Sequence, residues 1–458
     1  MGLFNALTSA VGGLQAQSFA IQNISGNIAN SQTIAYKDIN TSFLDLVSAA
    51  STPSQQVAGG VVAMSTATNS VQGAIQNATL GTDMAINGDG YFVVQAPLSF
   101  SGTTPIFGGV NSFTRRGDFQ LNAQGYLVNG AGYYLEGLPI DPTTGVATGS
   151  VAAPLQFQSN FLPAVATTQI QYGINLPTNP VTNAFKASIP NSELLNPVNF
   201  TADPTVAGTG TVIGSDVSAF VDESIDGGSI TAYNGAGSPA NLQFRWAKVD
   251  SVANGGADTW ELFYQTDATA TGATVAWKNA GTDFVFSPSG QLNPSITSLT
   301  LNNVSVNGDA IGNVTVNSPV GSITQFASTN GTSTVNNLQQ NGYAAGQLQS
   351  IAVGKNGDIT GSFSNGQSVA LAEIPLVHFN SPDNLKSLDG GAYQETAESG
   401  AALSGASGQI VGQSLESSNA DIATEFTKLI VTQQAYSANT KVITTANQMS
   451  QDLLNIIR

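Results

Sequence analysis

Apolar residues recur every seven positions at both ends of the chain. Near the N-terminus the repeat falls on Leu7, Leu14, Ile21 and Ile28. Near the C-terminus it falls on Leu415, Ile422, Leu429, Tyr436, Ile443 and Ile457, with Phe426 and Leu454 beside them. This spacing predicts two amphipathic helices with one apolar seam each. Two such seams at opposite ends of one chain favour pairing with each other.

The pattern between the two ends is typical of β-strands. The apolar run 91–94 follows a Gly-Asp-Gly turn, and apolar positions alternate around two Asn-Gly turns within residues 350–371, which indicates hairpins. Residues 151–330 contain short apolar runs such as LQFRW and TWELFY, separated by Gly, Asn, Asp and Pro. That middle part predicts a β-sandwich or barrel.

These patterns predict an α+β multi-domain fold in which antiparallel β domains are nested between paired, coiled-coil-like terminal helices. The expected parts are a helical domain (1–30 with 415–458), a linker or connecting arm (31–75), an inner β domain (76–150 with 331–414) and an outer β domain (151–330) of one or two subdomains. The arm is expected because residues 48–70 are rich in Gly, Ser, Thr and Ala.

Composition narrows the classes of partner and chemistry. The 458 residues carry a net charge of −17 and only 9% charged side chains, and the basic residues are scattered, so nucleic acid and anionic membranes are poor partners. There is no cysteine, which removes disulfides and thiolate sites. We find no apolar stretch of membrane-spanning length and no secretory signal pattern, and therefore expect no membrane insertion.

Candidate catalytic and metal-binding residues are few. The single histidine, His378, lies in the apolar run IPLVHF without a nucleophile elbow, so a structural role is favoured over catalysis. Asp83, Asp89 and Asp118 lie in Gly-rich turns without the spacing of a calcium loop. Turn stabilisation explains them. We expect no catalytic, metal or cofactor site.

Two features admit a structural and an assembly interpretation. The adjacent pair Arg115-Arg116 predicts either an ion pair between subunits or a solvated hairpin edge. The uncharged Gln, Asn, Ser and Thr faces of the terminal helices fit either a closing helical hairpin or burial against copies of the same chain, because such faces can be buried without desolvating ions. The second interpretation is favoured for the helices.

Specific motifs carry a resemblance to a known family. ISGNIANSQTIAYK (24–37) resembles the N-terminal signature of bacterial flagellar rod and hook proteins, matching at Asn27, Ala29, Asn30, Thr33, Tyr36 and Lys37. The segment from Ser414 to Arg458 is similar to the terminal helix of that family, and segments such as DMAINGDGYFVV and GYAAGQLQSIAVGKNGDITGSFSNGQ resemble the inner β domain of its hook members. The residues that the resemblance and the seams implicate in subunit packing are Leu7, Leu14, Ile21, Asn27, Ile28, Asn30, Thr33, Tyr36, Lys37, Glu416, Asn419, Phe426, Leu429, Gln433, Tyr436, Asn439, Ile443 and Leu454.

The resemblance implies a non-enzymatic subunit that polymerises into the extracellular hook, the flexible tube that transmits torque from rod to filament. It also implies export through the flagellar type III apparatus without a cleaved signal peptide. The implied partners are further copies of the chain, the distal rod protein, the hook cap and the hook–filament junction proteins. The alternatives are another flagellar axial protein, or a secreted β-rich adhesin or polysaccharide-active protein.

Two positions depart from the family pattern. Ala35 stands where many members have Gly, so the turn there differs if the position requires positive φ. Gln434 stands where many members have Arg, so no salt bridge is expected at that position.

Overall fold

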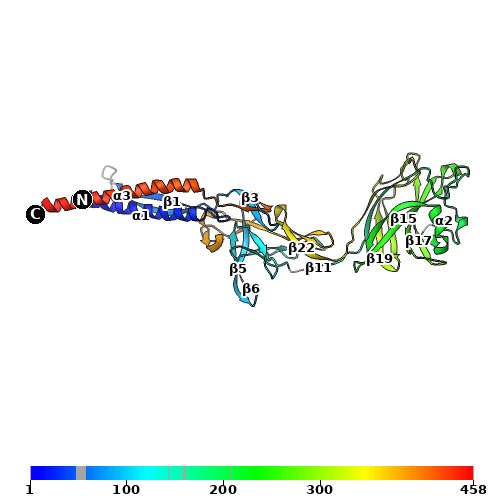
Figure 1. Ribbon diagram of the computed structural model, residues 1–458, viewed down its shortest axis with the longest axis horizontal. Coiled ribbons are helices and arrows are strands. Elements are labelled where there is room, and N and C mark those ends of the chain that lie inside the picture. The colour runs from blue at the N-terminus through cyan, green and yellow to red at the C-terminus, as the bar shows by residue number, and fades with distance from the viewer. Residues whose placement is uncertain (1, 48–57, 143, 158–160, 207, 457–458) are drawn as a thin grey trace. The chain divides into compact units, whose positions relative to one another are not determined.

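The computed structural model describes residues 2–47, 58–142, 144–157, 161–206 and 208–456 (Figure 1). The chain divides into two compact units. Unit 1 comprises Met1–Asn160 and Leu348–Arg458, and unit 2 comprises Phe161–Gln347. Most of the described secondary structure is β, with three α-helices among the described residues.

The two long helices lie side by side in unit 1 and run antiparallel (Figure 1). Helix α1 spans Gly2–Ala29 and helix α3 spans Ile422–Ile456. Two contacts fix their register. Asn27 Nδ2 donates to Glu425 Oε2 over 3.1 Å, and a Cβ placed on Gly13 would lie 2.7 Å from Asn439 Nδ2. The two residue numbers have the same sum in both contacts. The alignment of α3 with α1 is therefore the same at both places, as expected for two antiparallel helices with the same seven-residue repeat.

Small and polar residues, rather than large apolar ones, form the centre of this helix pair. On α1 the buried positions are Ala10, Gly13, Ala16, Ala20, Ile24 and Asn27, and on α3 they are Glu425, Thr432 and Ala446. The apolar repeat predicted from the sequence flanks this stripe, since Leu7, Leu14, Ile21 and Ile28 are all half-buried. Small residues allow the two helix backbones to approach closely, because they place little volume between the axes.

Part of the expected connecting arm is an antiparallel hairpin packed on α1. Strand β1 (Ile39–Val47) pairs with β2 (Ala58–Ala67), and residues 48–57 of the expected arm lie outside the described residues. Asn23 Nδ2 on α1 donates to Thr41 Oγ1 over 2.9 Å and to Ser65 Oγ over 3.2 Å. The hairpin therefore covers one side of α1.

The β part of unit 1 is built from chain segments on both sides of unit 2. The central sheet order is β22-β23-β24-β9-β5-β6-β27-β26. Its strands are β5 (Tyr91–Ser101), β6 (Thr104–Thr114), β9 (Tyr134–Pro139), β22 (Gly346–Val353), β23 (Asp358–Phe363), β24 (Ser368–Glu373), β26 (Lys386–Leu388) and β27 (Ala392–Gln394). Shorter strands complete it: β7 (Phe119–Leu121), β8 (Leu127–Asn129), β10 (Ala153–Pro154), β25 (Leu376–His378) and β28 (Leu403–Ser404). The core contains Met84, Ile86, Phe92, Phe119, Leu135, Ile359 and Ile374.

Two small antiparallel pairs connect this sheet to the helices. Strand β4 (Met84–Asn87) pairs with β29 (Gln409–Gly412), and β3 (Ile75–Asn77) pairs with β30 (Ser414–Glu416). The outgoing and returning chain therefore run together between the helix pair and the sheet, and β30 lies directly before α3.

Unit 2 consists of two sheets that share one core, which is the arrangement of a sandwich. One sheet has the order β18-β19-β12-β20 with β21 also on β12, and the other has the order β13-β17-β16-β15-β14. The strands of these two sheets are β12 (Gln169–Leu176), β13 (Thr211–Ile213), β14 (Ile225–Tyr233), β15 (Pro239–Asp250), β16 (Asp258–Gln265), β17 (Val275–Phe286), β18 (Ser298–Val306), β19 (Asp309–Asn317), β20 (Ile323–Gln325) and β21 (Thr334–Gln340). The short strand β11 (Phe161–Leu162) belongs to neither sheet and pairs with the first residues of β22.

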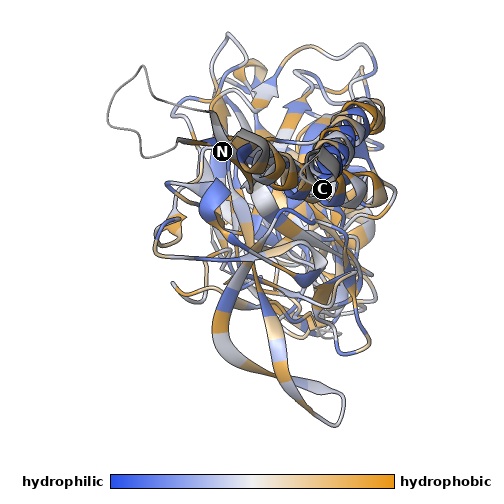
Figure 2. Ribbon diagram, turned by 90° about the vertical axis from the view of Figure 1, so that its left-hand side faces the viewer, coloured by the Kyte–Doolittle hydropathy of each residue, from blue (hydrophilic) through white to orange (hydrophobic). Residues whose placement is uncertain are grey.

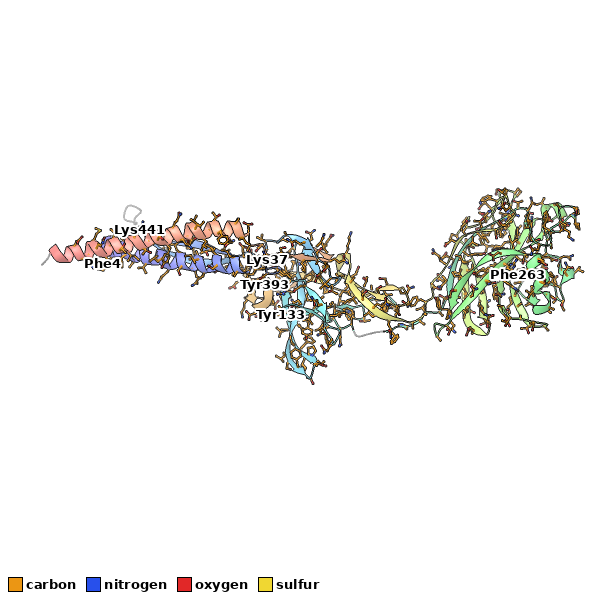
Figure 3. The ribbon with its side chains drawn as sticks, viewed as in Figure 1. Phe4, Lys37, Tyr133, Phe263, Tyr393 and Lys441 are labelled. Atoms are coloured by element: carbon orange, nitrogen blue, oxygen red, sulfur yellow. The ribbon has the colours of Figure 1, made fainter. Side chains whose placement is uncertain are left out.

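Aromatic side chains fill the interior of unit 2. In the main core, Trp246 Nε1 donates to Tyr172 Oη over 2.9 Å, and Tyr172 Oη donates to the Gly227 carbonyl over 2.6 Å. A smaller core lies under helix α2 (Val217–Asp222), where Phe220 packs edge-on against Phe263 (Figure 3). Because the Trp246 indole and the Tyr172 phenol have hydrogen-bond partners, neither adds an unsatisfied polar group to the main core. The indole Nε1 of Trp260 in the same core has no partner among the described residues.

Candidate functional site

The signature residues of 24–37 form the turn by which the chain leaves α1. Asn30 Nδ2 donates to the Gly26 carbonyl over 2.9 Å, and its Oδ1 accepts from Thr33 Oγ1 over 3.1 Å. The Thr33 amide donates to the Asn30 carbonyl over 3.0 Å. Asn30 and Thr33 thus satisfy the backbone groups left free where a helix ends.

Ala35 is the tightest point of this turn. Its φ is 55° and it is buried. Its amide donates to the Glu416 carbonyl over 2.8 Å, so the left-handed conformation aligns a backbone hydrogen bond to β30. The position therefore has the positive φ that would suit glycine, and the alanine methyl group costs roughly 1–2 kcal/mol there.

Asn27 connects α1, the turn and α3 through a single buried side chain. Its Oδ1 accepts from Tyr36 Oη over 3.1 Å and from the Ile39 amide over 2.9 Å. Its Nδ2 donates to the Ile39 carbonyl over 3.0 Å and to Glu425 Oε2 over 3.1 Å. All four hydrogen-bonding positions of the amide are used, which requires an asparagine.

Glu416 holds a buried ion cluster on the other side of the turn. Lys37 Nζ lies 2.5 Å from its Oε1, and Arg115 Nη1 lies 3.3 Å from its Oε2. The Gly73 amide also donates to Oε1 over 2.7 Å. Burial lowers the pKa of Lys37, and the Glu416 carboxylate opposes that shift. Lys37 lies where the helices meet the first strands of unit 1 (Figure 3).

Asn419 closes the same region from the start of α3. Its Oδ1 accepts from the Asp38 amide over 2.7 Å, and its Nδ2 donates to Thr68 Oγ1 over 3.0 Å. Its own amide donates to the Tyr36 carbonyl over 3.2 Å. We call the residues Asn27, Asn30, Thr33, Ala35, Tyr36, Lys37, Arg115, Glu416, Asn419 and Glu425 the joint.

The joint gathers most of the signature residues predicted for subunit packing and gives them partners within one chain. The expectation of an inter-subunit ion pair is wrong for Arg115, because this side chain is buried and bonded to Glu416 and to the Gly90 carbonyl, 3.0 Å from Nε. Arg116 also pairs within the chain, with Nε 2.7 Å from Asp118 Oδ1.

The remaining predicted packing residues lie along α3 with different exposures. Leu429, Asn439 and Ile443 are half-buried, and Asn439 lies against Gly13 of α1. Phe426, Gln433 and Tyr436 are exposed. The side chain of Leu454 lies outside the described residues. Sequence reasoning missed Glu425 and Gly13, although both belong to a seven-residue repeat of small and polar residues that could have indicated the inner face.

The other candidate side chains form no common site among the described residues, and His378 Nδ1 is buried there without a hydrogen-bond partner. Asp118 accepts from the Gly130 amide over 3.3 Å as well as from Arg116, and burial raises the pKa of Asp83. His378 lies half-buried in β25. Within the described residues no group of three or more His, Cys, Asp or Glu side chains is arranged to hold a metal ion. No described helix is long and apolar enough to cross a membrane.

Comparison with known proteins identifies the family. Three family models match: the flagellar hook protein FlgE/F/G D1 domain at residues 85–212, the flagellar basal body protein FlaE D2 domain at 223–343, and the flagellar basal body rod FlgEFG protein C-terminal region at 411–456.

Relatives match over the full length. The flagellar hook protein FlgE of Brucella abortus is 30% identical over 468 residues, covering 100% of both chains. Those of Caulobacter vibrioides and Salmonella typhimurium are 28% and 26% identical and cover 100% and 98% of this chain and 100% of each relative. The crystal structure of Helicobacter pylori flagellar hook protein FlgE2 aligns with a TM-score of 0.49 at 16% identity, covering 73% of this chain and 98% of that one. The chain belongs to the family of flagellar hook proteins and is a structural subunit of the hook.

Proposed function

We propose that the chain polymerises into the hook through the outward faces of its terminal helices, which wind as a coiled-coil-like pair and pack among copies of themselves. The observation that carries this proposal is the inverted polarity of α3. Its inner face holds Glu425, Thr432 and Asn439, while large apolar side chains on its other faces are between 40% and 61% exposed. Those side chains are Ile422, Phe426, Ile430, Val431, Tyr436, Val442 and Met449.

This polarity is the reverse of that of a helix that only closes a domain. Such a helix places its apolar stripe inward and its polar side chains in water. Large apolar side chains exposed in this number along one helix favour an interaction site. Neighbouring copies can cover it at low cost, because α1 contains no charged side chain that would have to be desolvated.

The joint gives this polymer a mechanical connection. Its ion cluster and its Asn27 network bind the end of α1, the start of α3 and the first strands of unit 1 to one another. Torque carried by packed helices therefore passes to the β part of unit 1 through buried, fully bonded side chains. When the tube bends, the contacts that change are those between the β domains of neighbouring subunits.

Family membership supports the remaining parts of the proposal. The chain leaves the cell through the flagellar type III export apparatus without cleavage of a signal peptide and assembles outside the cell. Its neighbours at the ends of the hook are the distal rod protein and the hook–filament junction proteins, and the hook cap guides the addition of subunits. The protein has no enzymatic activity.

Replacing one exposed apolar side chain of α3 tests the polymer interface. Val431→Asp places a charge on a side chain that is 61% exposed, so the monomer should keep its fold but fail to form sedimentable tubes. Val198→Asp is the matched control, because Val198 is 88% exposed in unit 2, and this variant should assemble. Tubes of normal yield from Val431→Asp, with the helix signal in circular dichroism unchanged, would exclude α3 as the interface.

A further inference from the structure

A two-stranded finger extends from the sheet of unit 1. Strands β5 and β6 stay paired as far as Ser101 and Thr104, and the ribbon projects beyond the other strands with hydrophobic segments along it (Figures 1 and 2). We call residues 98–106 the finger. Leu98 and Phe100 are 77% and 57% exposed, and Ile106 is also exposed. At its base, the Phe107 ring packs edge-on against the Tyr134 ring, with 5.1 Å between the ring centroids. This contact fixes the base of the ribbon against β9.

A groove of about 780 Å³ opens on the same unit. Its walls are largely apolar and include Val93, Val110, Phe113, Val151, Val377 and Ala402. Two acidic side chains, Glu136 and Glu395, are among its lining residues. Glu136 of β9 is 1% exposed, and its Oε2 has no hydrogen-bond partner among the described residues. Burial raises the pKa of this carboxyl to about 7. A buried carboxyl oxygen without a donor is costly, so a partner that supplies one is favoured.

The finger and the groove complement each other in chemistry. The tip carries the hydroxyl groups of Ser101, Thr103 and Thr104 between the apolar Phe100 and Ile106. The groove carries one buried acceptor without a partner, Glu136 Oε2, among walls that are largely apolar but also include Asn111, Gln394 and Glu395. A hydroxyl or backbone amide of the tip would therefore meet Glu136 while the flanking side chains cover apolar surface.

A finger cannot enter the groove of its own chain. Val93 and Val110, which line the groove, belong to the base of the same ribbon, and the tip at Gly102 is nine residues further along β5, roughly 30 Å in an extended strand. The groove must take the finger of another copy. A contact between two different surfaces of identical subunits does not close on itself unless the rotation forms a ring, and otherwise it generates a helical filament.

We propose that the finger of one subunit inserts into the Glu136 groove of a neighbouring subunit and forms a head-to-tail contact between the β parts of the hook. This contact rests on the proposed polymerisation through the helices and adds a second, outer connection to it.

Paired cysteines test the contact directly, because the natural sequence contains none. Thr103→Cys combined with Val151→Cys places one thiol at the tip and one in the groove. After assembly and mild oxidation, this protein should give a ladder of covalent oligomers on a non-reducing gel. The control combines Thr103→Cys with Leu121→Cys, a partly exposed position of β7 outside the groove, and should give no ladder.

The outcomes separate this inference from the proposed function. Tubes without a ladder, or an equal ladder in the control, would overturn the finger contact while leaving helix-driven assembly intact. Failure of the unmodified chain to form tubes would overturn both.

A second variant tests the contribution of the contact without any cross-link. Phe100→Ser with Ile106→Ser changes two exposed side chains, so unit 1 keeps its fold. The critical concentration for assembly should rise about tenfold or more. The reason is that the contact no longer buries a large apolar side chain, and each such loss lowers the affinity by at least a factor of about ten. An unchanged critical concentration would overturn the inference.

Discussion

Lys37 Nζ lies 2.5 Å from Glu416 Oε1, and the two side chains are only 2% and 0% exposed. Lys37 follows the turn after α1, and Glu416 ends the strand that precedes α3. Arg115, at the end of β6, approaches the other carboxylate oxygen of Glu416. One carboxylate therefore pairs with two buried cations that come from distant parts of the sequence.

Removing the charge of Glu416 should destabilise unit 1 strongly. Glu416→Gln leaves Lys37 and Arg115 buried beside a neutral amide, and breaking a buried ion pair in this way costs about 3–5 kcal/mol. We expect the free energy of unfolding of the monomer, measured by urea titration, to fall by that amount.

The partly exposed ion pair nearby provides the comparison for Glu416. Arg116 and Asp118 are 18% and 15% exposed, so Asp118→Asn should cost about 1 kcal/mol or less. A loss of about 1 kcal/mol or less for Glu416→Gln as well would mean that Glu416 contributes no more than a surface charge.

The sequence located the joint but could not show its geometry. The N-terminal motif contained Asn27 and Lys37, and the C-terminal segment contained Glu416. Nothing in their spacing showed that Glu416 pairs with Lys37 and with Arg115, because these contacts cross hundreds of residues. Arg115 was expected at a surface, since charged residues are rarely fully buried unless they are paired. Its partner was not visible in the local sequence.

The helix seam was misplaced for a different physical reason. Apolar residues predict the buried face of a helix in a monomer, but in a polymer subunit the largest apolar residues, such as Phe426, can face neighbouring copies. The contact between α1 and α3 of one chain is then formed by small residues such as Gly13. In the expected connecting arm, a Cβ on Gly59 would lie 1.6 Å from the Leu46 carbonyl oxygen. Glycine there permits close packing rather than flexibility.

Ala35→Gly should stabilise the protein. Ala35 has a φ of 55°, which costs alanine roughly 1–2 kcal/mol but glycine almost nothing. The more flexible unfolded chain of the glycine variant offsets part of this gain, so we expect a net increase of about 0.5–1 kcal/mol in the free energy of unfolding. Ala438→Gly, at an exposed position within α3, should lower it by about 1 kcal/mol. If Ala35→Gly lowered the free energy of unfolding as much as Ala438→Gly does, the left-handed conformation at Ala35 would be contradicted.

Gly13→Val should weaken the pairing of α1 with α3. A Cβ at Gly13 would lie 2.7 Å from Asn439 Nδ2, so the helices must separate or Asn439 must move. We expect a loss of about 1–3 kcal/mol on overpacking, and partial rescue when Asn439→Ala is added. In Gly26→Ala the new Cβ meets nothing within 4 Å, so this variant should gain up to about 1 kcal/mol from helix propensity. Additive effects of Gly13→Val and Asn439→Ala would show that the two residues are not in contact.

Glu261 should make the stability of unit 2 depend on pH. Burial raises its pKa from an ordinary 4.5 to about 8, and the nearby Asp283 carboxylate adds to the shift. Below pH 4.5 the carboxyl is protonated in both the folded and the unfolded chain. As the pH rises, the unfolded chain loses this proton first, so stability falls until the folded pKa of about 8 is passed and then stays constant.

Glu261→Gln should abolish that slope. The glutamine remains neutral at every pH and can keep an oxygen to accept the hydrogen bond from Asn279, which is 2.8 Å long in the native protein. The variant should therefore match the native protein in acid and exceed its free energy of unfolding by roughly 2–5 kcal/mol at pH 9. Urea titrations across this range measure the effect, with the exposed Glu398→Gln as the control. The contradicting result is a native free energy of unfolding that follows that of the glutamine variant between about pH 5 and pH 8, without an additional decrease. It would show that Glu261 is already ionised in the folded protein, because a carboxyl that stays protonated in the folded chain lowers the stability in that interval.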